Sequence, residues 1–321
     1  MIFIGLISFI ITTLLTTFLI VIQKKLSISQ FIRSEGPKQH LDKKGTPTLG
    51  GISLATAQCV SLMPLTKNPI VVFYLKALIL FFLLGLLDDI IKINKIKNGI
   101  SARLKMFIQL IIASYLIISM PILAPAISTY IPMIGWLQLP FLIWLVLNLG
   151  AYAGTTNAIN LTDGLDGLLT LILLGVWTVM LSIMLKISSS LTPEQYSAAS
   201  ALTASNIGSL LSFLLFNSYR ASIFMGDAGS MGLGGSLCSL FCIFNAPLLL
   251  IGTLIIPVLE TISVILQVAS YRLRGKRIFK MTPLHHHFEQ SGYHESHITL
   301  RFFIINTCCF IMFAYSIFSA I

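Results

Sequence analysis

Two adjacent carboxylates, Asp88 and Asp89, follow a long apolar stretch of the chain. The run from residue 70 to residue 87 contains one lysine and is long and apolar enough to cross a bilayer. A charge at bilayer depth costs about 2.5–3.5 kcal/mol on insertion scales, so acids at such a boundary usually have a partner or a task. Two acids alone could mark a helix end among the lipid headgroups. A functional role is favoured because three further acids fall on the same predicted face of the membrane, namely Asp163, Asp166 and Asp227.

A second polar stretch, residues 157–167, carries Asn160, Asp163 and Asp166 between two apolar segments. The spacing of the two acids places both on one face of a helix or around a tight turn. The stretch lacks the length and the acidic ligands of a calcium-binding loop. Amides and carboxylates at a membrane edge suit the recognition of a polar ring such as a nucleobase.

The segment from Asn217 to Gly235 is the strongest single signal, because glycines flank Asp227 and then open a helix. Backbone N–H groups at a helix start attract phosphate. No Gly-Lys-Ser/Thr follows, so this is not a P-loop. Glycines in membrane helices can also serve only for packing. The acid among them favours a Mg²⁺ ligand, since Mg²⁺ prefers one or two carboxylates together with substrate phosphates.

Two basic loops complete the polar inventory. Residues 36–51 carry Lys43 and Thr48 and form either an anchor for anionic lipid or a strap that reaches a phosphate. Residues 283–289 contain three consecutive histidines but no HExxH or cysteine pairing typical of zinc sites. Imidazoles beside arginines and lysines indicate side chains that donate hydrogen bonds to phosphate. Carboxylates, a glycine-rich turn and cations together suit metal-assisted phosphoryl transfer, with a lipid as one reactant.

The elements that position these residues are membrane helices. The chain has 321 residues, of which 56% are hydrophobic and 10% charged, whereas a soluble domain carries about 25% charged residues. The sequence therefore predicts an all-α integral membrane protein, a single polytopic domain over residues 1–321. The net charge of +10 lies in short loops, so it indicates membrane orientation and not a nucleic-acid partner. The five cysteines lie in apolar segments and are expected to be buried hydrophobic residues.

Ten apolar segments predict about ten transmembrane helices. They are residues 2–22, 49–66, 70–87, 104–123, 137–155, 168–186, 198–216, 230–245, 247–270 and 300–320. Most of the 21 lysines and arginines fall in the loops after the odd-numbered segments. By the positive-inside rule those loops are cytoplasmic and both termini are outside, which puts the active site on the cytoplasmic face.

The ordered motifs resemble those of a known enzyme family. They are Gly-Thr-Pro-Thr-Leu-Gly-Gly at 45–51, Asp-Asp at 88–89, Asn-Leu-Thr-Asp-Gly-Leu-Asp-Gly at 160–167, Phe-Met-Gly-Asp-Ala-Gly-Ser at 224–230 and Pro-Leu-His-His-His-Phe-Glu at 283–289. The set resembles the polyprenyl-phosphate N-acetylhexosamine-1-phosphate transferases over about residues 36–301. The histidine run points to the phospho-N-acetylmuramoyl-pentapeptide-transferase branch. One departure is Leu49, where methionine is common.

The resemblance implies transfer of phospho-N-acetylmuramoyl-pentapeptide from UDP-N-acetylmuramoyl-pentapeptide to undecaprenyl phosphate, giving lipid I and UMP in peptidoglycan synthesis. It also implies a Mg²⁺ cofactor, a homodimer and a multi-pass location in the bacterial inner (cytoplasmic) membrane. The catalytic residues it implies are Asp88, Asp89, Asp227 and His285, with Asp227 the metal ligand. Phe224 would stack on uracil and Asp166 would bond its edge. The other implied substrate contacts are Lys43, Thr48, Asn160, Asp163 and Asn217 along the nucleoside and sugar path, and Lys92, Lys105, His286 and His287 at phosphates.

Two rival functions and one mechanistic choice stay open at this point. Transfer of N-acetylglucosamine phosphate is disfavoured by the histidine run. Transport is disfavoured because the acids gather at one face and no repeat is visible, whereas transporter sites lie near the midplane of repeated halves. Asp88 could act as a nucleophile that forms a phosphoryl-enzyme, or as a base that deprotonates the lipid phosphate.

Overall fold

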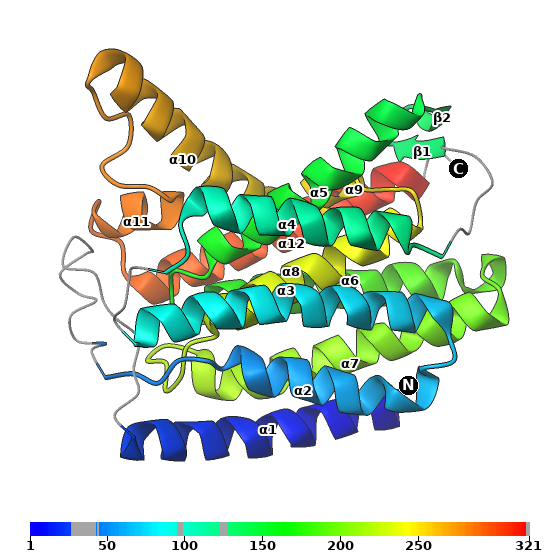
Figure 1. Cartoon of the computed structure of the whole chain (residues 1–321), viewed down its shortest axis with the longest axis horizontal. Helices are drawn as coiled ribbons and strands as arrows, with labels where there is room; N and C mark the ends of the chain where they lie inside the picture. Colours follow the sequence, from blue (N-terminus) through cyan, green and yellow to red (C-terminus); the bar gives the residue numbers. More distant parts are fainter. Residues whose placement is uncertain (27–42, 44, 95–98, 122–127, 319–321) are drawn as a thin grey trace.

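The computed structural model describes residues 1–26, 43, 45–94, 99–121 and 128–318, and these are mostly helical (Figure 1). The long helices are α1 (Ile2–Lys25), α3 (Pro69–Ile93), α4 (Ala102–Ile118), α5 (Phe141–Thr162), α6 (Leu168–Lys186), α7 (Pro193–Asn217), α8 (Gly226–Ile243), α10 (Ile255–Arg274) and α12 (Glu295–Phe318). The shorter elements are α2 (Gly51–Leu62), α9 (Leu249–Thr253), α11 (Leu284–Glu289), the 3-10 turns η2 (Met63–Leu65) and η3 (Ser188–Ser190), and the strands β1 (Ser128–Ile131) and β2 (Gly135–Gln138).

Seven of the described helices are long and apolar enough to cross a membrane, namely α1, α3, α5, α6, α7, α10 and α12. The chain is therefore a polytopic membrane protein, as predicted. Each of the ten expected segments contains a helix. However, α2 has 12 residues, α4 has 17, and α8 is rich in glycine and serine, so the count of ten spans stays a prediction.

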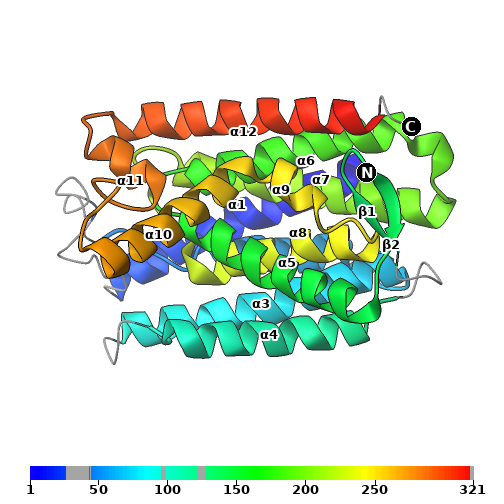
Figure 2. The ribbon, with the colours of Figure 1, turned by 90° about the horizontal axis from the view of Figure 1, so that it is seen from above.

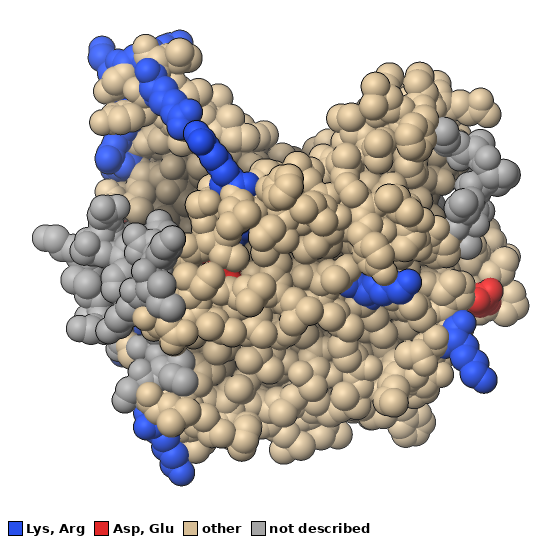
Figure 3. Space-filling view, in the orientation of Figure 1, with Lys and Arg blue, Asp and Glu red and all other residues tan. Residues whose placement is uncertain are grey.

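The helices run back and forth between two ends of the molecule (Figures 1 and 2). At one end, which we call the site end, α3, α5, α7 and α10 finish and α4, α6, α8 and α12 begin; α11 also lies there. The opposite, hairpin end holds the antiparallel pair β1–β2, the start of α1 and the end of α12. Lysines and arginines gather mainly near the site end in Figure 3, as the positive-inside pattern predicts for one face.

Helix α8 lies in the interior, where every residue from Ala228 to Ile243 is buried, and it packs on α3 and α5. Its contact with α3 depends on glycines. A Cβ on Gly85 would collide with the carbonyl oxygen of Asp227, and one on Gly235 would collide with the ring of Phe81. Small residues let membrane helices approach this closely. The two helices that carry Asp88, Asp89 and Asp227 therefore touch backbone to backbone.

Several helix limits differ from the predicted apolar runs. Helix α3 continues to Ile93, so Asp88 and Asp89 lie within it, and α5 is displaced to 141–162 because residues 135–138 pair in the hairpin. Helix α8 begins at Gly226 and not at 230, which puts Asp227 in its first turn.

The ninth predicted segment is divided into two helices, α9 and α10. The proline at 257 explains this break, because its ring clashes with the carbonyl four residues earlier in a continuous helix.

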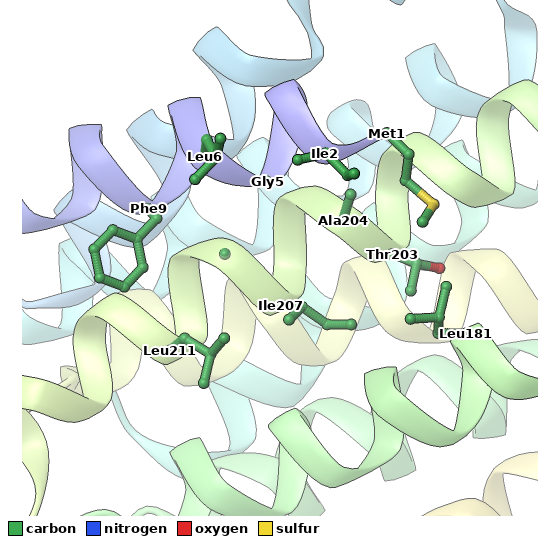
Figure 4. Close-up of a pocket in the computed structure, with 11 residues that line it drawn as sticks. Met1, Ile2, Gly5, Leu6, Phe9, Leu181, Thr203, Ala204, Ile207 and Leu211 are labelled. Atoms are coloured by element: carbon green, nitrogen blue, oxygen red, sulfur yellow. The ribbon is translucent and has the colours of Figure 1, made fainter.

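A groove of about 280 Å³ runs between α1 and α7 near the start of the chain (Figure 4). Met1, Gly5 and Phe9 face Ala204 and Leu211 across it. Its lining is apolar and it lies at the hairpin end, away from the acids. The groove is therefore separate from the candidate site.

Candidate active site

Two carboxylates and two lysines form a compact group at the site end, which we call the Asp–Lys cluster. Helix α3 supplies Asp88 and Lys92 one turn apart, α4 supplies Lys105, and α8 supplies Asp227. Oδ2 of Asp88 lies 2.7 Å from Nζ of Lys92 and 2.8 Å from Nζ of Lys105. Oδ2 of Asp227 lies 3.0 Å and 2.7 Å from the same two nitrogens. Each ammonium group thus bridges both acids.

The Asp–Lys cluster is largely buried and balanced in charge. Asp88 is 1% exposed, and its Oδ1 accepts a hydrogen bond from the backbone N–H of Ile100. The side chains of Lys92 and Lys105 are 31% and 15% exposed, so they are accessible from the site end. Ammonium groups held in this way can neutralise an incoming phosphate, which is the main requirement for phosphoryl transfer.

Asp89 holds the start of α8 through both of its carboxylate oxygens. Its Oδ1 accepts a hydrogen bond from the backbone N–H of Asp227 at 3.2 Å, and its Oδ2 accepts one from Ala228 at 2.9 Å. The first N–H groups of a helix have no partner within the helix, and a carboxylate there is also favoured by the helix dipole. Asp89 therefore fixes the turn from which the Asp227 side chain projects.

The turn between α5 and α6 brings two more acids to the site. The pKa of Asp163 is raised to about 8, because burial disfavours its charge and because the carboxylates of Asp227, Asp89 and Asp166 repel it. A hydrogen bond from the backbone N–H of Gly226 offsets only part of this effect. Asp163 thus lies within the electrostatic influence of Asp227, Asp89 and Asp166, and the neutral form of its carboxyl is favoured below about pH 8.

Asp166 belongs to a separate ionic group with Lys43 and Glu295. Lys43 Nζ lies 2.7 Å from Asp166 Oδ1 and 2.6 Å from Glu295 Oε1, and Glu295 also accepts the backbone N–H of Asp166 at 2.6 Å. The other oxygen of Asp166 accepts the backbone N–H of Ala221 at 3.0 Å. Burial lowers the pKa of Lys43, but the charges of Glu295 and Asp166 outweigh it and the pKa is raised. This group joins α12, the α5–α6 turn and the loop before α8.

The loop with Thr48 pairs with the segment before α8 through backbone hydrogen bonds. The N–H of Phe224 donates to the carbonyl of Pro47 at 2.9 Å, and the N–H of Gly50 donates to the carbonyl of Phe224 at 2.9 Å. Thr48 itself is 3% exposed, and its backbone N–H donates to the side chain of Gln23 at 3.0 Å. The residues on either side of Thr48 are therefore joined to Phe224, and the assignment of both residues to substrate binding stays a prediction. Residues 36–42 and 44 of the expected strap lie outside the described residues.

The two predicted asparagines differ in their surroundings. Asn160 stands in the last turn of α5 and donates to the hydroxyl of Ser230 at 2.8 Å, beside the start of α8. Asn217 is 3% exposed; its oxygen accepts from Thr170 at 2.7 Å and its nitrogen donates to the carbonyl of Ile223 at 3.0 Å. Both polar atoms of Asn217 thus have protein partners, and it holds the loop that precedes the glycine-rich turn.

Each of the three histidines has a different partner. Nδ1 of His285 lies 3.0 Å from Glu260, and Nδ1 of His286 lies 2.6 Å from Glu289. Nδ1 of His287 accepts the backbone N–H of Lys280 at 3.2 Å. His285 is buried against the α5–α6 turn, since a Cβ on Gly164 would collide with its Nε2. His285 therefore packs against Gly164, the residue that follows Asp163 in that turn.

Three glutamates that pair with predicted site residues were missed in the sequence analysis: Glu260, Glu289 and Glu295. Glu260 had a usable signal, because it is the only acid in the apolar segment 247–270 and an isolated acid at membrane depth needs a reason. No feature of the sequence pointed to Glu295, because its partner Lys43 is 252 positions away.

The donor set fits a divalent cation that also binds substrate. Among the described residues, no three His, Cys, Asp or Glu side chains converge as a metal site of their own. Mg²⁺ needs fewer protein ligands, because it usually keeps water and binds one or two carboxylates plus phosphate oxygens. Asp88 and Asp227 approach the same two ammonium groups, so they are close enough together to supply that number of carboxylates.

Comparison with known proteins supplies a family. The model of Glycosyl transferase family 4 matches residues 71–245, more than half of the chain. The chain is similar to proteins named phospho-N-acetylmuramoyl-pentapeptide-transferase. It is 41% identical to one from Clostridium perfringens (strain 13 / Type A), over 96% of each chain. It is 38% identical to one from Clostridium acetobutylicum, over 96% of each chain, and 36% identical to one from Halalkalibacterium halodurans, over 93% of this chain and 91% of that protein.

Proposed function

The chain belongs to the phospho-N-acetylmuramoyl-pentapeptide-transferase family, and from this membership we propose the reaction that it catalyses. It transfers phospho-N-acetylmuramoyl-pentapeptide from UDP-N-acetylmuramoyl-pentapeptide to undecaprenyl phosphate and so forms lipid I and UMP in peptidoglycan synthesis. The observation that supports this most directly is the pair Asp88 and Asp227, which share the ammonium groups of Lys92 and Lys105 at one end of a membrane bundle.

The transfer breaks one bond and forms another at phosphorus. A phosphate oxygen of undecaprenyl phosphate bonds to the β-phosphorus of the nucleotide sugar. The bond from that phosphorus to the bridging oxygen breaks, and UMP leaves with the oxygen. Asp88 and Asp227 hold the ammonium groups of Lys92 and Lys105 in place. These ammonium groups can pair with the negative charges of the substrate phosphates. His285, beside the α5–α6 turn, is the remaining catalytic group.

We propose that Asp227 holds Mg²⁺, with Asp163 close by in the α5–α6 turn. When bound, Mg²⁺ neutralises charge on the diphosphate and polarises it as a Lewis acid. Asp227 suits this role because it stands in the first turn of α8 and its carboxylate lies beside Lys92 and Lys105, which can pair with substrate phosphates. Asp89 contributes by fixing that turn.

The nucleoside and sugar contacts are assigned to the loops around the Asp–Lys cluster. Phe224 would stack on uracil and Asp166 would bond its edge, with Lys43 held close to Asp166 by their ion pair. Thr48, Asn160, Asp163 and Asn217 complete the path. His286 and His287 would bind phosphates from α11. The partners of Asn217 favour an indirect contribution, through the loop that carries Phe224.

The setting of the site follows from the membrane pattern. We propose ten spans, with α2, α4 and α8 added to the seven long apolar helices, both termini outside and the site end cytoplasmic. The protein would then lie in the bacterial cytoplasmic membrane, where undecaprenyl phosphate is available to it from the lipid phase. A homodimer is the expected assembly.

The function is tested with purified protein in detergent, undecaprenyl phosphate, Mg²⁺ and each of two donors. We expect UMP release with UDP-N-acetylmuramoyl-pentapeptide and little or none with UDP-N-acetylglucosamine. Equal turnover of both donors would reject the branch assignment, and release from neither would reject the reaction. A stoichiometric burst of UMP without the lipid acceptor would assign Asp88 as a nucleophile, whereas its absence would favour a base.

A further inference from the structure

Glu260 is a carboxylate buried within a membrane-spanning helix. It is the single acid of α10, and its side chain is fully inaccessible to solvent. A charge at membrane depth costs several kcal/mol unless it has a partner, so such residues usually serve a function. The hydrogen bonds of the Glu260 carboxylate among the described residues do not include the Asp–Lys cluster. Glu260 has no role in the reaction proposed for that cluster.

The partner of Glu260 is His285, which reaches it from α11. The Oε1 atom of Glu260 lies 3.0 Å from Nδ1 of His285, and both side chains are at most 1% exposed. The backbone N–H of His285 also faces the carboxylate, at 3.3 Å from Oε1 and 3.4 Å from Oε2. One carboxylate therefore fixes both the main chain and the ring of His285.

This contact determines which ring nitrogen carries the proton. An ionised carboxylate can only accept hydrogen bonds, so Nδ1 must be the donor and Nε2 of the neutral ring keeps its lone pair. Nε2 is buried and has no hydrogen-bond partner among the described residues. It lies against Gly164, directly beside Asp163 in the turn that adjoins the Asp–Lys cluster. A buried polar atom without a protein partner is uncommon and needs an explanation, of which a catalytic role is one.

We propose that Glu260 is a positioning residue for catalysis: it holds His285 in the Nδ1–H form and directs Nε2 toward the reacting phosphates. Nε2 can then accept a proton, or donate one after protonation, while the Glu260 carboxylate balances the positive ring. An acid behind a histidine serves this purpose in hydrolases and metal sites, where its loss costs about 10- to 10⁴-fold. The inference rests on the proposed transferase activity.

The first test is a double-mutant cycle on UMP release, with Glu260→Gln, His285→Gln and the double variant. The glutamine amide can donate to Nδ1 as well as accept from it, so the tautomer is no longer fixed. We expect Glu260→Gln to lower kcat at least about 100-fold, with KM for both substrates within about threefold. In the His285→Gln background the same change should alter kcat less than about threefold. A full additional loss there would show that Glu260 does not act through His285.

A matched control separates positioning from stability. Asn306 of α12 is also fully buried and holds the start of α10, accepting the N–H of Ile256 and donating to the carbonyl of Thr253, each at 3.1 Å. Asn306→Ala should lower the thermal midpoint while leaving kcat of the folded enzyme within about threefold. If Glu260→Gln does not fold, Glu260→Asp keeps the charge and should give an intermediate kcat. Wild-type kcat in either folded Glu260 variant would overturn the proposal.

The second test does not depend on activity. Nitrogen-15 NMR of histidine-labelled protein, with His285 assigned by its loss in His285→Gln, reports which ring nitrogen is protonated. We expect the Nδ1–H form in the wild type and a mixture or the Nε2–H form in Glu260→Gln. A wild-type Nε2–H ring would overturn the positioning role even in an active enzyme. An Nδ1–H ring in a protein that releases no UMP would refute the proposed function and leave the Glu260–His285 contact established.

Discussion

Asp89 on α3 holds the backbone of Asp227 on α8, because its carboxylate accepts the N–H of Asp227 at 3.2 Å and the next N–H, that of Ala228, at 2.9 Å. The two acids of the adjacent pair therefore have different surroundings. Asp88 faces two lysines, whereas Asp89 faces a helix start. Adjacent carboxylates in a sequence motif need not share one chemical task.

Replacing Asp89 tests this division of roles. Asp89→Ala leaves two buried N–H groups without a partner, and each such group costs about 1–3 kcal/mol, so we expect a lower thermal midpoint and a large loss of UMP release. Asp89→Asn retains an acceptor oxygen and should lose less of both. The control is Asn68→Ala, which removes the side-chain cap of α3 at the hairpin end and should lower stability without changing kcat. An Asp89→Ala protein as stable as the wild type would contradict the capping role.

Asp227→Asn should abolish most activity while the protein still folds. The neutral amide is less costly near the bilayer than a carboxylate, but it removes the charge proposed to hold Mg²⁺. The Lewis-acid contribution is several kcal/mol and each 1.4 kcal/mol is tenfold, so UMP release should fall at least about 100-fold. The stabilisation of the wild type by added Mg²⁺, measured as a rise in thermal midpoint, should also shrink. Near-normal turnover at ordinary Mg²⁺ would remove Asp227 from the metal site.

The raised pKa of Asp163 predicts a pH-dependent effect on stability in metal-free buffer. Its folded-state pKa of about 8 lies above that of an unfolded aspartate, about 3.9, so the folded protein binds the extra proton between these values. Stability from this group is complete at low pH and is lost as the pH rises toward 8. Asp163→Asn cannot lose a proton, so its thermal midpoint relative to the wild type should increase from pH 5 to pH 8 in EDTA. A difference that does not change with pH would refute the repulsion.

The proposed orientation can be tested by labelling single cysteines in intact cells. Lys276→Cys lies just after α10 at the site end, and Ser189→Cys lies in η3 at the hairpin end; both positions are exposed. In a background without the five native cysteines, a membrane-impermeant thiol reagent should label Cys at 189 and not at 276 until the cells are opened. The reverse result would place the candidate site outside the cell.

Hydrophobic length predicted where the helices lie, but not where they end. Lipid requires apolar side chains only within its core, so the polar last turns of α3 and α5, with Asp88, Asp89 and Asn160, extend beyond the apolar runs. The hairpin of residues 128–138 was not predicted, because its strands are only four residues each. Charge pattern placed the acids at one end correctly. The ionic partners of Asp166 could not be predicted, because Lys43 and Glu295 are distant from it in the sequence and meet it only through the tertiary fold.

The glycine contact between α3 and α8 has a consequence for motion. Because the backbones touch at Gly85 and Asp227, sliding or tilting one helix against the other would create collisions or voids. The position of Asp88 and Asp89 relative to Asp227 therefore depends on the absence of a side chain at residue 85. A methyl group there would push the two helices apart and separate the carboxylates that share the lysines.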